Sequence, residues 1–266
     1  MTPSARSERA CPAAAGEDGG ASPVRRRIRA LDALRGLAVV SMVLFHLCYD
    51  LRYLCGVGMP WFGGFSQDLW RASISWTFLL IAGAMCPQSR NNLGRALRYL
   101  ACAALVFVAS LLAGVDTPIS FGIIFCMGAS TLVAWLVSEL GLPRGRPAEA
   151  LLLFLAFLLA LGIPSGGVGL GDRMWIALPR ALYSTPWLSW LGFPGPTFAS
   201  GDYYPLLPYS LLFLSGASLG GWLVARGYPD WAYDATCPPL EFVGRHALAV
   251  YLLHQPLILI ALDLWA

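Results

Sequence analysis

Residues 29–53, RALDALRGLAVVSMVLFHLCYDLRY, form a long apolar segment that carries a row of polar side chains. Read as an α-helix at about 100° per residue, the segment places Asp32, Arg35, His46 and Asp50 within an arc of about 60°. The row extends over about 27 Å, which is close to the ~30 Å hydrocarbon core of a bilayer. A charge at the centre of a membrane costs several kcal/mol, so this face cannot contact lipid. We therefore expect the row to face other protein or a water-filled cavity.

The composition indicates an integral membrane protein. Hydrophobic residues make up 57% of the 266 residues, charged residues only 12%, and the mean hydropathy is +0.63. Soluble domains carry about twice that share of charge. A net charge of +3 is too small to indicate nucleic-acid binding. The seven cysteines form no CxxC pair and no metal-ligand spacing, so we expect neither a disulfide framework nor a metal site.

Seven apolar segments are long enough to span, or nearly span, a bilayer. We expect helices at about 30–54, 71–88, 96–115, 118–139, 148–164, 204–225 and 240–264. The fold class is therefore an all-α polytopic membrane bundle of about seven transmembrane helices. Residues 1–27 are rich in Ala, Gly, Pro and Ser without periodicity, so we expect a disordered cytoplasmic segment followed by one transmembrane domain over 28–266.

Residues 165–203, which the orientation predicted below places on the outer side, are rich in aromatic, Pro and Gly residues. This outer segment admits two interpretations. Trp and Tyr concentrate at membrane–water interfaces, so the segment can be an interfacial aromatic belt. Alternatively, it is a partly re-entrant lid whose aromatic faces receive an acceptor such as a sugar.

The chain has three histidines, and two of them, His46 and His254, lie deep inside predicted helices that run in the same direction. His46 lies about 16 residues, and His254 about 14, past the inner end of its helix, so their depths agree within about one turn. Pro256 removes a backbone donor beside His254, which predicts a kink there. Each histidine can be a general base, a proton relay, a metal ligand or a structural group hydrogen-bonded between helices.

The arginines near the inner face also admit two roles. Arg35, Arg90, Arg95 and Arg98 can anchor the chain at the cytoplasmic surface, or they can hold the phosphates of a donor that enters from the cytosol. Gly216 and Gly220 form a GxxxG pattern, which favours close helix packing over catalysis.

Five stretches resemble a known family of membrane-bound acyltransferases. They are RGLA at residues 35–38 with His46 eleven residues after Arg35, FLLIAGAM in the second helix, FGIIFCMGAS in the fourth, DYYPLLPY at 202–209 and GRHALAVYLLHQP at 244–256. The chain resembles the bacterial group related to the catalytic domain of heparan-α-glucosaminide N-acetyltransferase over residues 28–260. One departure is that the lysosomal enzyme carries Asn where this chain has His46.

The resemblance implies transfer of an acyl group, normally acetyl, from cytosolic acetyl-CoA to a sugar-like or amino-sugar acceptor on the outer side, in a bacterial inner membrane. It also implies that His46 occupies the position of the catalytic histidine of the wider acyltransferase group. No metal is implied, and the expected partners are membrane lipid, acyl-CoA and the glycan acceptor.

We accordingly expect His46 to act as general base, with Asp50, one turn away, orienting it. Arg35 would position the donor, together with Arg90, Arg95 and Arg98. His254 is the candidate proton relay, and the candidates for acceptor binding are Asp202 and Tyr203. Two other classes of function stay open. A transporter or proton-coupled carrier would use the same polar row as a pathway, and a structural subunit would tolerate the loss of His46.

The distribution of arginines predicts the orientation of the chain. With the N-terminus in the cytoplasm, fourteen arginines lie on the inner side and four, Arg52, Arg71, Arg173 and Arg180, on the outer side. Seven spans then place the C-terminus outside. A C-terminal alkaline phosphatase fusion should be active, and a fusion after Arg226 should be silent. The reverse pattern would show that the number of spans is wrong.

Overall fold

The computed structural model describes residues 27–114, 117–171 and 173–265. The α-helices in this part of the chain are α1 (Arg29–Tyr53), α2 (Gly64–Ala84), α3 (Asn92–Leu112), α4 (Ile123–Ser138), α5 (Pro147–Ala160), α6 (Leu206–Arg226), α7 (Asp230–Asp234), α8 (Pro238–Arg245) and α9 (Ala247–Trp265). The short 3₁₀-helices and strands are η1 (Cys86–Gln88), η2 (Ile163–Ser165), β1 (Gly167–Leu170), β2 (Arg173–Ala177), η3 (Arg180–Tyr183) and η4 (Pro186–Leu188).

The predicted helical membrane bundle is confirmed. Among the described residues, six helical segments are long and apolar enough to cross a membrane: α1, α2 with η1, α3, α5 with η2, α6 and α9. Helix α4 is a shorter apolar helix of 16 residues. The N-terminal segment that was predicted to be disordered covers residues 1–27. Residues 1–26 of it lie outside the described residues, which begin at Arg27.

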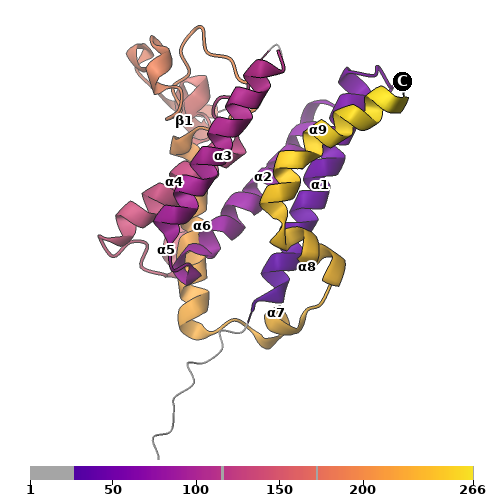
Figure 1. Cartoon of the computed structure of the whole chain (residues 1–266). Helices are drawn as coiled ribbons and strands as arrows, with labels where there is room; N and C mark the ends of the chain where they lie inside the picture. Colours follow the sequence, from indigo (N-terminus) through magenta and orange to yellow (C-terminus); the bar gives the residue numbers. More distant parts are fainter. Residues whose placement is uncertain (1–26, 115–116, 172, 266) are drawn as a thin grey trace, which may run out of the picture.

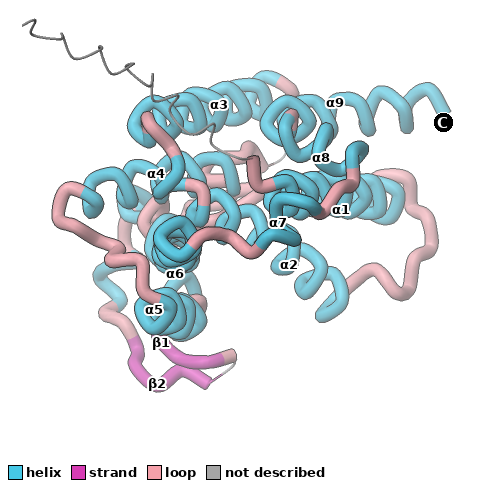
Figure 2. The backbone as a smooth tube through the Cα atoms, turned by 90° about the horizontal axis from the view of Figure 1, so that it is seen from below, coloured by secondary structure: helices cyan, strands magenta, loops and turns pink. Residues whose placement is uncertain are grey.

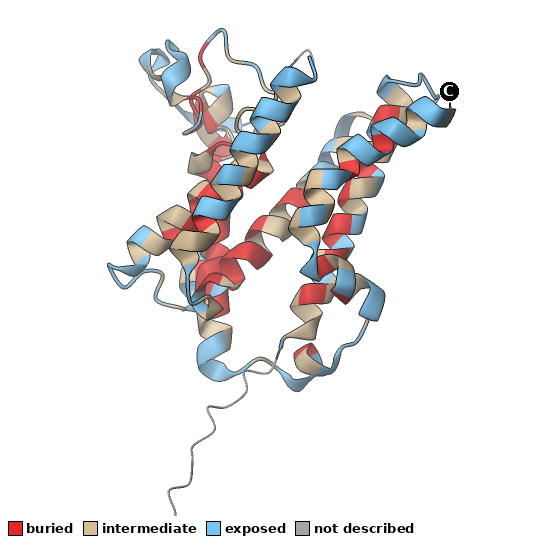
Figure 3. Cartoon of the chain, in the orientation of Figure 1, coloured by how far each residue is buried: buried red, intermediate tan, exposed pale blue. Residues whose placement is uncertain are grey.

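The helices form two groups that meet where α2 packs on α6 (Figure 1). One group surrounds α1, which contacts α2, α7, α8 and α9. In the other group, α6 contacts α2, α4 and α5, and α3 covers α4 (Figure 2). Figure 3 shows that the buried residues concentrate where α2 meets α6, whereas α3 and α9 are largely exposed. The exposed faces of these apolar helices are suited to lipid.

Glycines allow α2 and α6 to approach each other closely. A Cβ atom on Gly83 would overlap the carbonyl oxygen of Phe213, and Cβ atoms on Gly216 and Gly220 would overlap the carbonyl oxygens of Leu80 and Ala84. Small residues at such crossings bring two backbones into contact, which is how helices associate in lipid. The GxxxG pattern of α6 therefore serves helix packing.

Glycines also allow close backbone contact between α8 and α1. A Cβ atom on Gly36 would overlap the carbonyl oxygen of Leu240, and one on Gly244 would overlap that of Asp32. An ion pair between Arg29 and Glu241, with N···O at 3.1 Å, lies at the same crossing. Helix α8 is thus fixed against the first half of α1.

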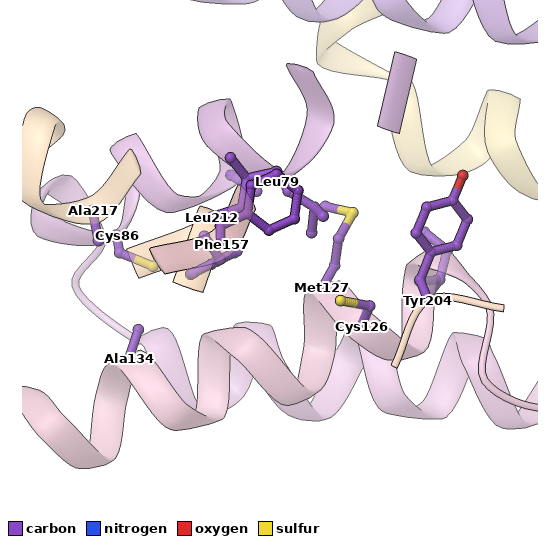
Figure 4. Close-up of a cluster of buried hydrophobic side chains, with 12 residues drawn as sticks. Leu79, Cys86, Cys126, Met127, Ala134, Phe157, Tyr204, Leu212 and Ala217 are labelled. Carbon is purple, nitrogen blue, oxygen red and sulfur yellow. The ribbon is translucent and has the colours of Figure 1, made fainter. Parts of the chain in front are cut away.

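The largest hydrophobic cluster joins α2, α4, α5 and α6. Leu79, Met127, Phe157 and Leu212 belong to this cluster, and Figure 4 shows Tyr204 at one edge of it. Burying large apolar side chains of this kind is worth roughly 1.5–3 kcal/mol each relative to water. In a bilayer the lipid is also apolar, so close packing of these side chains, more than exclusion of water, holds the group together.

The helix expected to begin at 71 begins seven residues earlier, at Gly64. Two further predicted boundaries are also wrong. The helix expected at 240–264 is divided at His246 into α8 and α9, because α8 is held to α1 by the Gly36 and Gly244 contacts while α9 takes a different direction. The helix expected to begin at 118 begins at Ile123, because the carboxylate of Asp202 accepts the backbone N–H of Ile123 at the helix start. Both boundaries depend on residues distant in the sequence.

Residues 165–171 and 173–203 fold as a small layer against α5 and α6. Its strands pair antiparallel and turn through Gly171, whose φ of +58° favours glycine. Beneath them, Ala160, Ile163 and Phe193 form a separate apolar cluster. Trp175 and Trp187 stay exposed, as interfacial aromatic residues do. The hairpin is a local departure from an otherwise all-α fold.

Candidate functional site

The two intrahelical histidines meet between α1 and α9. The ring centroids of His46 and His254 lie 4.8 Å apart, with the ring planes at 62°. This contact confirms the prediction that their depths match on parallel helices. His46 is half-buried and His254 is buried, 8% exposed.

The backbone determines which nitrogen of His254 is free. His254 Nδ1 lies 2.6 Å from the carbonyl oxygen of Tyr251. A carbonyl oxygen can only accept a hydrogen bond, so Nδ1 must carry the proton and donate it. In the neutral ring Nε2 is then an acceptor, and among the described residues this buried atom has no hydrogen-bond partner. His254 therefore offers an unoccupied basic nitrogen beside His46.

One turn further along α1, Asp50 is held by α9. Gln255 Nε2 donates a hydrogen bond to Asp50 Oδ2 at 2.8 Å, and Asp50 is buried. Since the amide nitrogen of Gln255 faces the carboxylate, its oxygen Oε1 faces away from it and is buried without a partner among the described residues. Asp50 was expected to orient His46, but the hydrogen bond that it accepts comes from Gln255. Sequence reasoning missed Gln255, although it directly follows His254.

The inner part of the polar row also has partners. Asp32 accepts hydrogen bonds from Arg27 at 2.5 Å and from Arg35 at 3.4 Å. Arg35 also donates to the carbonyl oxygen of Gly244 at 3.3 Å and contacts the sulfur of Met85. The row thus faces protein, as expected: α8 covers its inner part, and α9 its outer part.

A cavity of about 260 Å³ begins beside Arg35 and lies between the two groups of helices. Arg95, Arg98 and Arg245 line it together with Arg35, and its other walls are mainly apolar and aromatic. The Nε atom of Arg95 is buried without a partner among the described residues. Four guanidinium groups around one cavity form a site suited to phosphate oxygens.

Tyr251 connects this cavity to the histidine pair. It lines the cavity, and its ring centroid lies 5.6 Å from that of His254. A ligand with an anionic end at the arginines and a long, thin apolar arm could therefore reach the histidines. Along α1, Arg35 and His46 are about 16 Å apart at ~1.5 Å per residue.

The expected donor-binding arginines divide into two sets. Arg35, Arg95 and Arg98 line the cavity, whereas Arg90 is exposed in the connection between α2 and α3 and does not. Arg245 was not predicted. Its sequence signal is its position in GRHAL, just before the helix break at His246.

Asp202 and Tyr203 hold the connection before α6 in place. Asp202 Oδ2 accepts the N–H of Ile123 at 3.0 Å, and the hydroxyl of Tyr203 donates to the carbonyl oxygen of Ser189 at 2.6 Å. Burial raises the pKa of Asp202 to about 6, and the bond from Ile123 opposes this rise. Ile123 also lines the cavity, so Asp202 lies directly behind its wall.

This fold and site define a polytopic membrane protein with a cavity lined by arginines and, next to the cavity residue Tyr251, a pair of histidines. The family model for heparan-α-glucosaminide N-acetyltransferase, catalytic, matches residues 27–256. The chain belongs to this family and is therefore a membrane acetyltransferase-like domain. Comparison with curated proteins and with solved structures found no significant match.

The pair formed by Asp50 and Gln255 allows a test of the contact between α1 and α9. Gln255→Leu should lower the melting temperature in detergent, because a buried acceptor that loses its partner costs about 1–3 kcal/mol. The double variant Asp50→Leu/Gln255→Leu should recover most of this loss, since replacing both partners with apolar groups is nearly neutral. If the loss of the double variant instead equals the sum of the losses of the two single variants, the hydrogen bond does not stabilise this contact.

Proposed function

We propose that the chain transfers an acetyl group from acetyl-CoA to a sugar-like or amino-sugar acceptor. The observation that carries the proposal is the cavity, which is lined by four arginines and by Tyr251, whose ring contacts that of His254. Membership of the N-acetyltransferase family supports acetyl-CoA as donor and an amino group as acceptor.

The arginines would bind the phosphates of the donor. Arg98 and Arg245 are exposed and can meet a ligand at the cavity entrance, whereas Arg35 and Arg95 lie deeper and are held by neighbouring groups. The adenine end would stay near the surface, since phosphates do not enter an apolar interior without pairing. The pantetheine arm would extend past Tyr251 and place the thioester beside the histidines.

The histidine pair would provide the base. As the acceptor nitrogen attacks the thioester carbonyl carbon, a C–N bond forms, the C–S bond breaks, and the acceptor proton passes to a histidine. His46 is the proposed general base. His254 Nε2 can accept the same proton or relay it, because its Nδ1 proton is committed to the Tyr251 carbonyl. The departing CoA thiolate then takes up a proton.

The other predicted site residues take supporting roles in this proposal. Asp50 stays bonded to Gln255 and contributes negative charge one turn from His46, which favours a protonated histidine during transfer. Asp202 and Tyr203 would shape the acceptor side, behind the cavity wall at Ile123. Arg90 would serve only as an anchor at the inner surface.

We place the protein in a bacterial inner membrane, with the N-terminus in the cytoplasm and the C-terminus outside. The bias of arginines supports this orientation. Donor and acceptor would then enter from opposite faces and meet at the histidines. A carrier remains the rival function, and it would neither cleave acetyl-CoA nor bind it at the arginines.

Removal of either histidine tests the catalytic role. His46→Ala should lower the rate of acetyl transfer by about 10²–10⁴, the usual contribution of a general base. His254→Ala should lose as much or less, and the double variant should be little worse than the worse single variant, because groups that act as a unit are not additive. CoA release from the purified protein measures the rate.

His246→Ala is the matched control for the histidine variants, since His246 is exposed and its side-chain Nδ1 bonds to the carbonyl oxygen of Phe242 within α8. It should retain the wild-type rate. A wild-type rate in His46→Ala would remove the catalytic claim, and fully multiplicative losses in the double variant would argue against one shared site.

Donor binding depends on the arginines at the cavity entrance. Arg98→Gln/Arg245→Gln should weaken CoA binding by about a hundredfold or more, because each of the two charge-assisted hydrogen bonds contributes about 1.5–3 kcal/mol. Calorimetry in detergent measures the affinity. Arg90→Gln, outside the cavity, should bind CoA as the wild type does. Equal affinities in all three proteins would exclude this cavity as the donor site.

A further inference from the structure

A second hollow, of about 530 Å³, lies where the connection between α4 and α5 meets the start of α5. Arg144 and Arg146 border it, and its other lining residues include Leu142, Leu152 and Leu153. The start of α5 lies toward the end of the molecule where α1 begins and α6 ends (Figure 1). The hollow shares no lining residue with the cavity beside Arg35.

The connection that carries these arginines is held rigidly against α6. Ser218, which is fully buried, accepts the backbone N–H of Arg146 at 3.3 Å, and its hydroxyl oxygen also lies 3.1 Å from the carbonyl oxygen of Arg146. Gly145 has a φ of +65°, and a Cβ there would press on the backbone of Gly221. The backbone at both arginines is therefore positioned before any ligand arrives.

The side chains of Arg144 and Arg146 have no carboxylate partner among the described residues. Other arginines at this end do have partners: Arg29 pairs with Glu241, Arg35 with Asp32, and Arg226 lies over the ring of Trp222. The carboxylate of Glu149, which also lines the hollow, accepts a hydrogen bond from Ser218 at 2.6 Å. The hollow is therefore lined by the two positive charges of Arg144 and Arg146 and by one negative charge, Glu149, which is already hydrogen-bonded to Ser218.

The remaining wall is apolar and continues along α5. Leu152 is 67% exposed, and Leu153 and Ala156 extend the wall one turn further. A free phosphate would contact only the arginines and leave this wall unused. A ligand with both an anionic head and an acyl chain fits both parts.

We propose that this hollow binds an anionic phospholipid, with its phosphate at Arg144 and Arg146 and an acyl chain along Leu152, Leu153 and Ala156. The position at an end of the membrane-spanning helices puts the arginines at headgroup level and the apolar wall at acyl level. The site is separate from the donor cavity and does not depend on the proposed acetyl transfer.

Native mass spectrometry of the purified protein tests the proposal. The detergent-solubilised chain is titrated with phosphatidylglycerol and, separately, with phosphatidylcholine of the same acyl chains. The wild type should retain phosphatidylglycerol in preference to phosphatidylcholine. Arg144→Gln/Arg146→Gln should weaken phosphatidylglycerol binding by about 30-fold, since one arginine near an anionic lipid contributes about fivefold.

Two further variants separate charge from shape. Arg90→Gln is the matched control: an exposed arginine at the same end, outside the hollow, whose loss should change lipid retention little. Ala156→Phe fills the apolar wall without altering charge and should also reduce retention. Melting temperatures show whether each variant is folded.

Three outcomes would overturn the proposal. One is equal loss of phosphatidylglycerol in Arg90→Gln and in Arg144→Gln/Arg146→Gln, which would indicate only a diffuse surface charge. Another is full retention in Ala156→Phe. The last is displacement of the lipid by millimolar inorganic phosphate, which would show a site for a soluble anion.

Discussion

The structure depends on covering the polar row of α1. Asp32, Arg35, His46 and Asp50 share one face of a helix whose other faces are apolar, and no such face can be left in hydrocarbon. The segment from 238 to 255 covers it: α8 reaches Arg35 through the carbonyl of Gly244, and α9 supplies His254 and Gln255. The end of the chain is therefore required for the start of the chain to be stable in a membrane.

The break at His246 follows from this covering and also shapes the cavity. Helix α8 must lie close enough to α1 for backbone contact at Gly36 and Gly244, whereas α9 must bring two large polar side chains against α1. One straight helix does not meet both requirements at once. Residues on both sides of the break, Arg245 and Ala247 among them, line the cavity beside Arg35. The constraint that covers the polar row thus also shapes this cavity.

Much of this arrangement could be predicted from local pattern. Period and length identify the spans, and depth along parallel helices brings His46 and His254 together, because a helix has a fixed rise per residue. Two kinds of feature could not be predicted. The start of α4 at Ile123 is set by Asp202, which lies 79 residues later. Arg90 and Arg245 are both arginines near the predicted inner ends of helices, so the sequence does not distinguish them. The packing of α8 against α1 places Arg245, and not Arg90, at the cavity.

Four buried side-chain polar atoms have no hydrogen-bond partner among the described residues: Asn92 Oδ1, Arg95 Nε, His254 Nε2 and Gln255 Oε1. Each such atom costs about 1–3 kcal/mol, so chains retain few of them without a reason. Arg95 lines the cavity, whereas His254 contacts Tyr251, another lining residue, and Gln255 follows His254 in the chain. A donor at Arg95 Nε and acceptors at His254 Nε2 and Gln255 Oε1 match an anionic ligand head at one end and N–H or O–H groups at the other. This complementarity is what a site that joins a phosphorylated donor to an amino or hydroxyl acceptor requires.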